Sequence, residues 1–201
     1  PPAVIDWTRP PQLPPRFRRR TAARAITQYY RGEIGTAAAC DLLRARLVLP
    51  AAREFLALQA ADERRHAGLY RAYLERIGGI DPRASAIGAA CARALSWDGA
   101  PEGIMLFFHV LLEGESLRLQ RALAQWMPCP LFAEIGAAIA RDEARHVAFG
   151  RLYLRHALPR IARDERLAML GWVRALWHSA VGDGAAGIVP AGPGARARWL
   201  E

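Results

Sequence analysis

Lysine is absent from this sequence of 201 residues, so its 28 basic residues are all arginine. A formal net charge of +9 would ordinarily favour a nucleic-acid partner. The arginines are spread along the chain, however, apart from one dense group at residues 16–20. The lack of lysine, together with abundant alanine, glycine and proline, is typical of a GC-rich genome and explains the charge without a binding surface. We therefore do not expect nucleic acid to be a partner.

Cysteine and long apolar runs are also scarce. Cys40, Cys91 and Cys129 form no Cys-x-x-Cys pair, which argues against a disulfide framework or a zinc knuckle. Their interpretation as reduced thiols predicts a cytoplasmic protein. No apolar run reaches the roughly eighteen residues of a transmembrane helix, and residues 1–20 contain no stretch that resembles a secretory signal. No membrane span is expected.

Proline and glycine are concentrated at the two ends. Residues 1–20 are rich in proline and arginine, which predicts an extended arm. Residues 182–201 are rich in glycine and proline without apolar periodicity, which predicts a loose tail. Residues 21–181 lie between them and are long enough to form one domain with a substantial core.

This central segment has the pattern of an all-α protein, because apolar residues recur three and four positions apart and no segment alternates as a strand does. The spacing predicts helices over residues 21–49 (ended by Pro50), 51–77 (ended by Gly78), 83–95, 101–127, 130–158 and 160–181. The long helices form two helical hairpins joined by a long crossover. We therefore expect a four-helix bundle with a fifth, C-terminal helix.

Two Glu-x-x-His motifs carry the chemistry, Glu63 with His66 and Glu143 with His146. Positions three apart in a helix lie about 60° apart around its axis, so the carboxylate and the imidazole can reach one metal ion together. A single such motif is weak evidence, because Glu and His are common on helix surfaces. Two motifs on two long helices are much stronger evidence for metal binding.

The two motifs belong to an internal repeat with an offset of 80 residues (143 − 63 and 146 − 66). The same offset pairs Glu33 with Glu113, whereas the neighbouring Glu115 falls opposite Gly35. The repeat therefore selects one glutamate from each of two helices and one Glu-x-x-His from each of the other two. This is the ligand set of a di-iron or di-manganese carboxylate bundle.

Charge supports the same interpretation. Apolar residues are expected to share the helix face of each single glutamate, among them Leu106, Val110 and Leu117 beside Glu113. Burying four carboxylates and two neutral imidazoles without cations would cost far more than the fold can supply. Two divalent ions would neutralise the four negative charges. The sequence therefore predicts two metal ions.

Residues 21–158 resemble the ferritin-like di-iron carboxylate superfamily, and Arg141–His146 is most similar to its oxidase and oxygenase branches. These branches include ribonucleotide reductase small subunits, aldehyde-deformylating oxygenases and arylamine N-oxygenases. The resemblance implies that Glu63 and Glu143 bridge two metal ions and that Glu33 and Glu113 are terminal ligands. It also implies that His66 and His146 each bind one ion.

The resemblance gives roles to two further acids and leaves two other residues open. Asp62 and Asp142 are expected to hold the free N–H of the opposite histidine. The alternative is that each aspartate pairs on the helix surface with the arginine three residues later, Arg65 or Arg145. His109 is either a seventh ligand or, as we prefer, a core histidine. Whether Glu115 joins the site is also open.

The function implied by the resemblance is an oxidase or oxygenase that uses two iron ions and dioxygen to oxidise a small apolar substrate. Manganese or a mixed Mn/Fe pair suits the same ligands. The expected partners are an external electron donor and a second copy of the chain. The apolar stripe of the last helix needs burial, either on its own bundle or across a two-fold dimer interface.

Two alternatives belong to other classes. One is a ferroxidase or peroxide-scavenging, iron-handling protein of the bacterioferritin or rubrerythrin kind, against which no rubredoxin-like Cys-x-x-Cys pairs are present. The other is a non-catalytic helical scaffold or RNA-binding bundle, which would leave the repeated ligand set without a purpose.

Overall fold

The computed structural model describes residues 5–13, 19–84 and 86–184. Regular structure in these residues is entirely helical, which confirms the predicted all-α class. In chain order the elements are α1 (Arg19–Arg46), α2 (Pro50–Ile77), α3 (Ala86–Leu95), α4 (Glu102–Met105), the π-helix η1 (Leu106–Leu112), α5 (Glu113–Trp126), α6 (Pro130–Ala157), the 3₁₀ turn η2 (Leu158–Arg160) and α7 (Arg163–Gly184).

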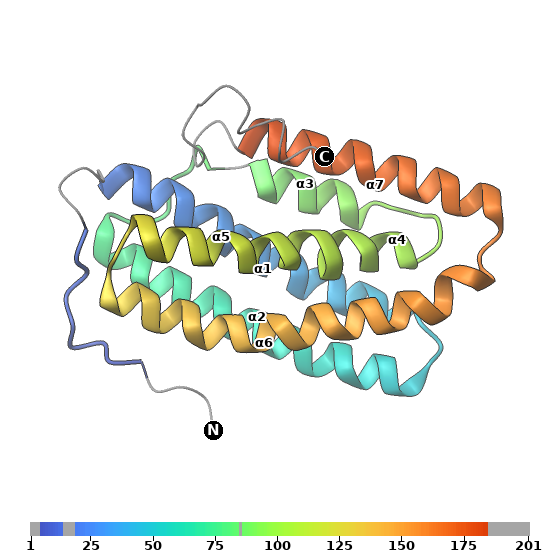
Figure 1. Ribbon diagram of the computed structural model, residues 1–201, viewed down its shortest axis with the longest axis horizontal. Helices are drawn as coiled ribbons and strands as arrows, with labels where there is room; N and C mark the ends of the chain where they lie inside the picture. The colour runs from blue at the N-terminus through green and yellow to red at the C-terminus, as the bar shows by residue number, and fades with distance from the viewer. Residues whose placement is uncertain (1–4, 14–18, 85, 185–201) are drawn as a thin grey trace.

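The long helices lie side by side along the molecule as two antiparallel pairs (Figure 1). The first pair is α1 with α2, and the second is the continuous α4–η1–α5 segment with α6. Because α2 ends and α4 begins at opposite ends of the molecule, residues 78–101 cross its whole length and carry α3 on the way. The two hairpins and the long crossover are as predicted.

Prolines and glycines set several helix ends. Pro50 and Pro130 occupy the first turns of α2 and α6, where the missing N–H of proline is not needed. Gly78 and Gly79 have φ values of 126° and 89°, which residues with a side chain rarely adopt. The backbone N–H of Gly79 donates to the carbonyl of Leu74 at 2.7 Å, so the predicted end of this helix is confirmed.

The first helix is shorter than predicted, because α1 ends at Arg46 and not at Leu49. Pro50 restricts the residue before it, and Leu49 accordingly has an extended backbone (φ −71°, ψ 114°). The Arg46 guanidinium donates to the backbone carbonyls of Trp97, at 2.9 Å, and Gly99. The connection between α1 and α2 is thus tied to the crossover.

The predicted helix over residues 101–127 changes its winding in the middle, where η1 is a π-helix. The wider turn changes which side chains point inward: Phe107, Phe108 and His109 are fully buried. The predicted apolar stripe beside Glu113 is buried only in part, and Leu106 and Val110 pack against a core cluster. Its members Leu106, Val110 and Leu117 are all half-buried.

The predicted last helix is confirmed as α7, which packs mainly on α3 and η1 of its own chain. Trp172 stacks on Trp97 with ring centroids 4.3 Å apart, and Val173 is buried. Leu167 and Leu170 on the same helix remain 57% and 48% exposed. The apolar stripe predicted to need burial is therefore buried only in part within the chain.

The ends of the domain differ slightly from the prediction. Arg19 and Arg20 belong to α1 and not to the arm, and residues 182–184 belong to α7 and not to the tail. Arm residues 5–13 contain no helix; Arg76 donates to the carbonyls of Trp7 (2.6 Å) and Arg9 (2.9 Å). The remaining arm residues 1–4 and 14–18, and tail residues 185–201, lie outside the described part of the chain.

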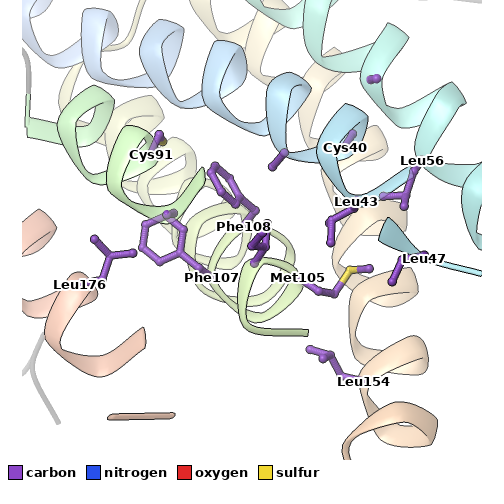
Figure 2. Packing of buried hydrophobic residues seen from close by; sticks show 14 of the residues in the cluster. Cys40, Leu43, Leu47, Leu56, Cys91, Met105, Phe107, Phe108, Leu154 and Leu176 are labelled. Atoms are coloured by element: carbon purple, nitrogen blue, oxygen red, sulfur yellow. The ribbon is translucent and has the colours of Figure 1, made fainter. Parts of the chain in front are cut away.

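The core consists of two apolar clusters, one toward each end of the helices. The first includes Leu43, Leu56, Phe107, Phe108 and Leu176, and Figure 2 shows its phenylalanines among residues of α1, α3 and α7. The second includes Ile26, Tyr70, Leu74, Phe132 and Ile139. Along α1, α2 and α6 the predicted ligands fall between the two clusters. The candidate site therefore lies at mid-length, with apolar packing on both sides.

Two predictions from the sequence concern membrane-spanning helices and the cysteines. None of the helices described has the length and apolar character needed to cross a membrane. Cys40, Cys91 and Cys129 are buried free thiols.

Candidate metal centre

The six predicted ligands come from four helical segments and are all buried. Their exposed fractions do not exceed 5%: Glu33 on α1, Glu63 and His66 on α2, Glu113 at the start of α5, and Glu143 and His146 on α6. The structure brings these six side chains together at the centre of the bundle. Their donor atoms form two groups, each with atoms within 4.8 Å of one another.

The first donor group contains Glu33, Glu63, His66 and Glu143. His66 Nδ1 lies 3.5 Å from Glu33 Oε2, 3.5 Å from Glu63 Oε2 and 3.4 Å from Glu143 Oε1. One imidazole nitrogen therefore faces three carboxylate oxygens from three helices. A single cation in their midst would satisfy all four residues.

The second donor group contains Glu63, Glu113 and His146. His146 Nδ1 lies 2.9 Å from Glu63 Oε1 and 3.9 Å from Glu113 Oε2. Glu63 belongs to both groups and offers a different oxygen to each histidine. Glu143 falls in the first group, so of the two bridging carboxylates implied by the resemblance only Glu63 is shared here.

The atoms that face the centre are those without hydrogen-bond partners. Among the described residues, the buried side-chain atoms without such a partner include Glu63 Oε2, His66 Nδ1, Glu113 Oε2, Glu143 Oε1 and His146 Nδ1. A buried polar atom with no partner costs about 1–3 kcal/mol, and more when the group is charged. Such a concentration of unpaired donors in one place fits a metal site, because coordination would satisfy them all.

Protonation in the absence of metal reflects the same crowding. Burial, and then repulsion from neighbouring carboxylates, raises the pKa of Glu33 and Glu113 well above the ordinary value, and burial also raises the pKa of Glu143. Burial opposes ionisation of Glu63 as well, but His146 and His66 outweigh it and lower the pKa of this carboxyl. Without a cation, three of the four crowded carboxyls therefore resist ionisation.

Each histidine is held from behind by an aspartate of the opposite helix. His66 Nε2 lies 3.2 Å from Asp142 Oδ2, and His146 Nε2 lies 3.4 Å from Asp62 Oδ2. The predicted pairing is confirmed. An Nε2–H that donates to a carboxylate leaves Nδ1 as the lone-pair nitrogen that points to the centre.

The alternative pairing, with arginines on the helix surface, is present at the same time. Arg65 donates to Asp62 at 2.6 Å, and Arg145 contacts Asp142 at 2.7 Å, each within one helix. Both arginines also reach the aspartate of the other helix. The two aspartates thus connect the buried histidines to a ring of alternating charges at the surface between α2 and α6.

Gln59 is a residue of the site that the sequence analysis missed. It is 1% exposed, and its Nε2 donates to Glu113 Oε1 at 2.7 Å and to Glu63 Oε1 at 3.3 Å. Its position four residues before Glu63 was an available signal, since residues four apart share a helix face. That position alone could not show that the side chain reaches another helix.

His109 and Glu115, whose roles the sequence left undecided, both lie outside the two donor groups. His109 is fully buried and its Nε2 donates to Gln59 Oε1 at 3.0 Å, but it belongs to neither donor group. Burial lowers its pKa to about 3. Glu115 is 27% exposed and accepts from Arg118 Nε at 3.0 Å, so it points away from the site.

The chain matches no protein-family model, no curated protein and no solved structure. What the centre can do therefore follows from its own donor atoms. Carboxylate oxygens together with imidazole nitrogens suit first-row divalent metals such as iron and manganese. The buried Glu/His cluster can hold a metal ion.

Proposed function

We propose that the protein is a ferritin-like di-metal carboxylate oxidase or oxygenase, with two iron ions bound by Glu33, Glu63, His66, Glu113, Glu143 and His146. Manganese or a mixed Mn/Fe pair suits the same donors. Dioxygen is the oxidant, a small apolar organic molecule is the substrate, and an external donor supplies electrons.

One observation supports the proposal above all: the two donor groups share Glu63, and two further members of each group are related by the 80-residue repeat. Glu33 and His66 in one group correspond to Glu113 and His146 in the other. Two ions with four carboxylates make a neutral site, whereas one ion leaves it negative. A neutral centre is the arrangement that a buried position favours.

When bound, a pair of redox-active ions supplies the electrons for the reduction of dioxygen. The residues of the chain supply the surroundings. The two apolar clusters flank the donor groups and exclude water from them. Asp62 and Asp142 hold the histidine rings with Nδ1 inward. These features support a closed, preorganised site for a small substrate.

The test is anaerobic titration with Fe²⁺, followed by exposure to dioxygen and by light scattering. Two ions per chain, oxygen uptake after reduction and a small oligomer, most simply a homodimer, would support the proposal. A large shell that accumulates iron far beyond two ions per chain would replace it with the iron-handling alternative. Failure to bind two ions would overturn it. Glu75→Gln is a suitable control, because Glu75 pairs with Arg71 on the exposed surface of α2.

A further inference from the structure

The 80-residue repeat is broken at the residues that stand one turn before the ligands. Gln59 on α2 corresponds to Ile139 on α6, and His109 in η1 corresponds to Tyr29 on α1 (139 − 59 and 109 − 29). All four side chains are buried, with exposed fractions between 0% and 7%. One half of the centre therefore has a polar pair where the other half has an apolar residue and a tyrosine.

The polar pair is oriented without ambiguity by its contacts. The Gln59 amide nitrogen faces oxygens of Glu113 and Glu63. Both carboxyls are ionised when they bind metal, and an ionised carboxylate only accepts hydrogen bonds. The amide oxygen therefore faces His109, and His109 Nε2 must carry the hydrogen that it donates at 3.0 Å. Because both ends of the amide are engaged, Gln59 cannot turn away from Glu113 without losing a buried hydrogen bond.

The hydrogen bond from Gln59 makes the two oxygens of Glu113 different. Oε1 accepts from Gln59, whereas Oε2 is buried, has no hydrogen-bond partner among the described residues, and belongs to the side that faces His146. Glu113 is thereby held to offer one oxygen to an ion. Glu33, the counterpart of Glu113, receives no such hydrogen bond from the counterparts of Gln59 and His109. Ile139 has no side-chain donor, and the Tyr29 hydroxyl forms no hydrogen bond with a described residue.

A third broken pair of positions in the repeat leaves room for His109. Gly150 on α6 packs against His109, and a Cβ atom placed on Gly150 would lie 2.4 Å from His109 Cβ. The corresponding residue 80 positions earlier is Tyr70, which stacks on Tyr29 with ring centroids 5.5 Å apart. A tyrosine pair in one half is thus replaced by a histidine and a glycine in the other.

The geometry points to Gln59, held by His109, as a positioning residue that makes the two metal sites of the proposed centre unequal. It fixes the Glu113 carboxylate before an ion arrives, whereas the Glu33 carboxylate keeps both oxygens available. The inference rests on the proposed two-metal function. It predicts that the ion held by Glu63, Glu113 and His146 depends on Gln59, and that the ion of the first donor group does not.

The test is Fe²⁺ binding to the whole protein under argon, measured against a competing chelator so that the two affinities are resolved. Gln59→Leu should lower the affinity for one of the two ions by about 10–100-fold, the usual effect of losing a hydrogen-bond partner of a ligand. The affinity for the other ion should not change. Gln120→Leu is the matched control: Gln120 is also buried and donates to Tyr70 at 3.1 Å, outside both donor groups. It should leave both affinities unchanged.

His109→Phe provides a second, independent variant that keeps an aromatic ring of similar size. This variant leaves the Gln59 amide oxygen without its hydrogen-bond donor. It should lower the affinity for the same ion by a smaller factor. An equal loss of affinity for both ions, or no loss of affinity in either variant, would overturn the inference while the two-metal function stands. If the unaltered protein binds fewer than two Fe²⁺ ions, the proposed function and this inference both fail.

Discussion

His66 on α2 and Asp142 on α6 are joined by a contact of 3.2 Å between Nε2 and Oδ2, and the repeat reproduces it between His146 and Asp62 at 3.4 Å. Each buried histidine is therefore supported by an aspartate from the other helix. Asp142 has a lowered pKa because His66 and Arg145 outweigh its burial, so the carboxylate stays ionised and can hold the imidazole N–H.

Replacement of this support should weaken metal binding without removing a ligand. Asp142→Asn keeps the size of the side chain but loses the charge that fixes the His66 ring. We expect a loss of Fe²⁺ affinity of about 10–100-fold, as is typical for the partner of a metal-binding histidine. Equilibrium titration measures the effect. An affinity equal to that of the Glu75→Gln control would contradict the assigned role.

Glu113 and Glu115 provide a direct test of the selected ligand. Glu113 is 3% exposed and lies in the second donor group, whereas Glu115 pairs with Arg118 away from the centre. Glu113→Gln should lose one of the two ions, and Glu115→Gln should retain both. Metal analysis of the purified variants after loading with Fe²⁺ measures the difference. The reverse pattern would show that Glu113 is not the terminal ligand.

Metal removal should lower stability, and the loss should grow with pH. Without metal, burial raises the pKa of Glu33, Glu113 and Glu143 above the ordinary 4.5. An acid whose pKa is raised by folding stabilises the protein below its unfolded-state pKa, and this stability is lost as pH rises through the folded-state pKa. Glu63, with a lowered pKa, has the opposite dependence, but its contribution is already complete above about 4.5.

Melting of the chelated and the iron-loaded protein across mildly acidic to mildly alkaline pH measures this difference. Each ion should raise stability by about 2.7 kcal/mol at a free concentration one hundred times its Kd. The chelated protein should melt at progressively lower temperature as pH rises above about 4.5, because its carboxyls ionise without a cation. Equal melting temperatures, with loss of metal demonstrated, would contradict the prediction.

Two glycines on α6 should respond to alanine in opposite ways. Gly150→Ala places a Cβ 2.4 Å from His109 Cβ and should lower the free energy of unfolding by about 1–3 kcal/mol through overpacking. A Cβ on Gly136 meets no atom within 4 Å, so Gly136→Ala should raise that free energy by up to about 1 kcal/mol through helix propensity. Urea denaturation compares the two. Equal effects would show that His109 moves easily.

Much of the fold was accessible from sequence, because it depends on local properties of the chain. Apolar spacing predicted the helices, and Gly78 predicted the end of α2. The 80-residue offset identified which glutamates converge, since residues related by a repeat occupy related places in the two hairpins. Metal content, oxygen chemistry and assembly as a dimer remain predictions.

What only the tertiary structure decided is local geometry that depends on the neighbouring helices. In the π-helical turn η1 the consecutive residues Phe107, Phe108 and His109 are all fully buried, which the sequence pattern did not predict. The contact of Arg46, the last residue of α1, with the backbone carbonyl of Trp97 in the crossover also depends on packing. The reach of Gln59 on α2 to Glu113, 54 positions later, depends on how the two helical hairpins face each other. A sequence pattern assigns a side chain to a helix face; packing then determines which buried polar group it meets there.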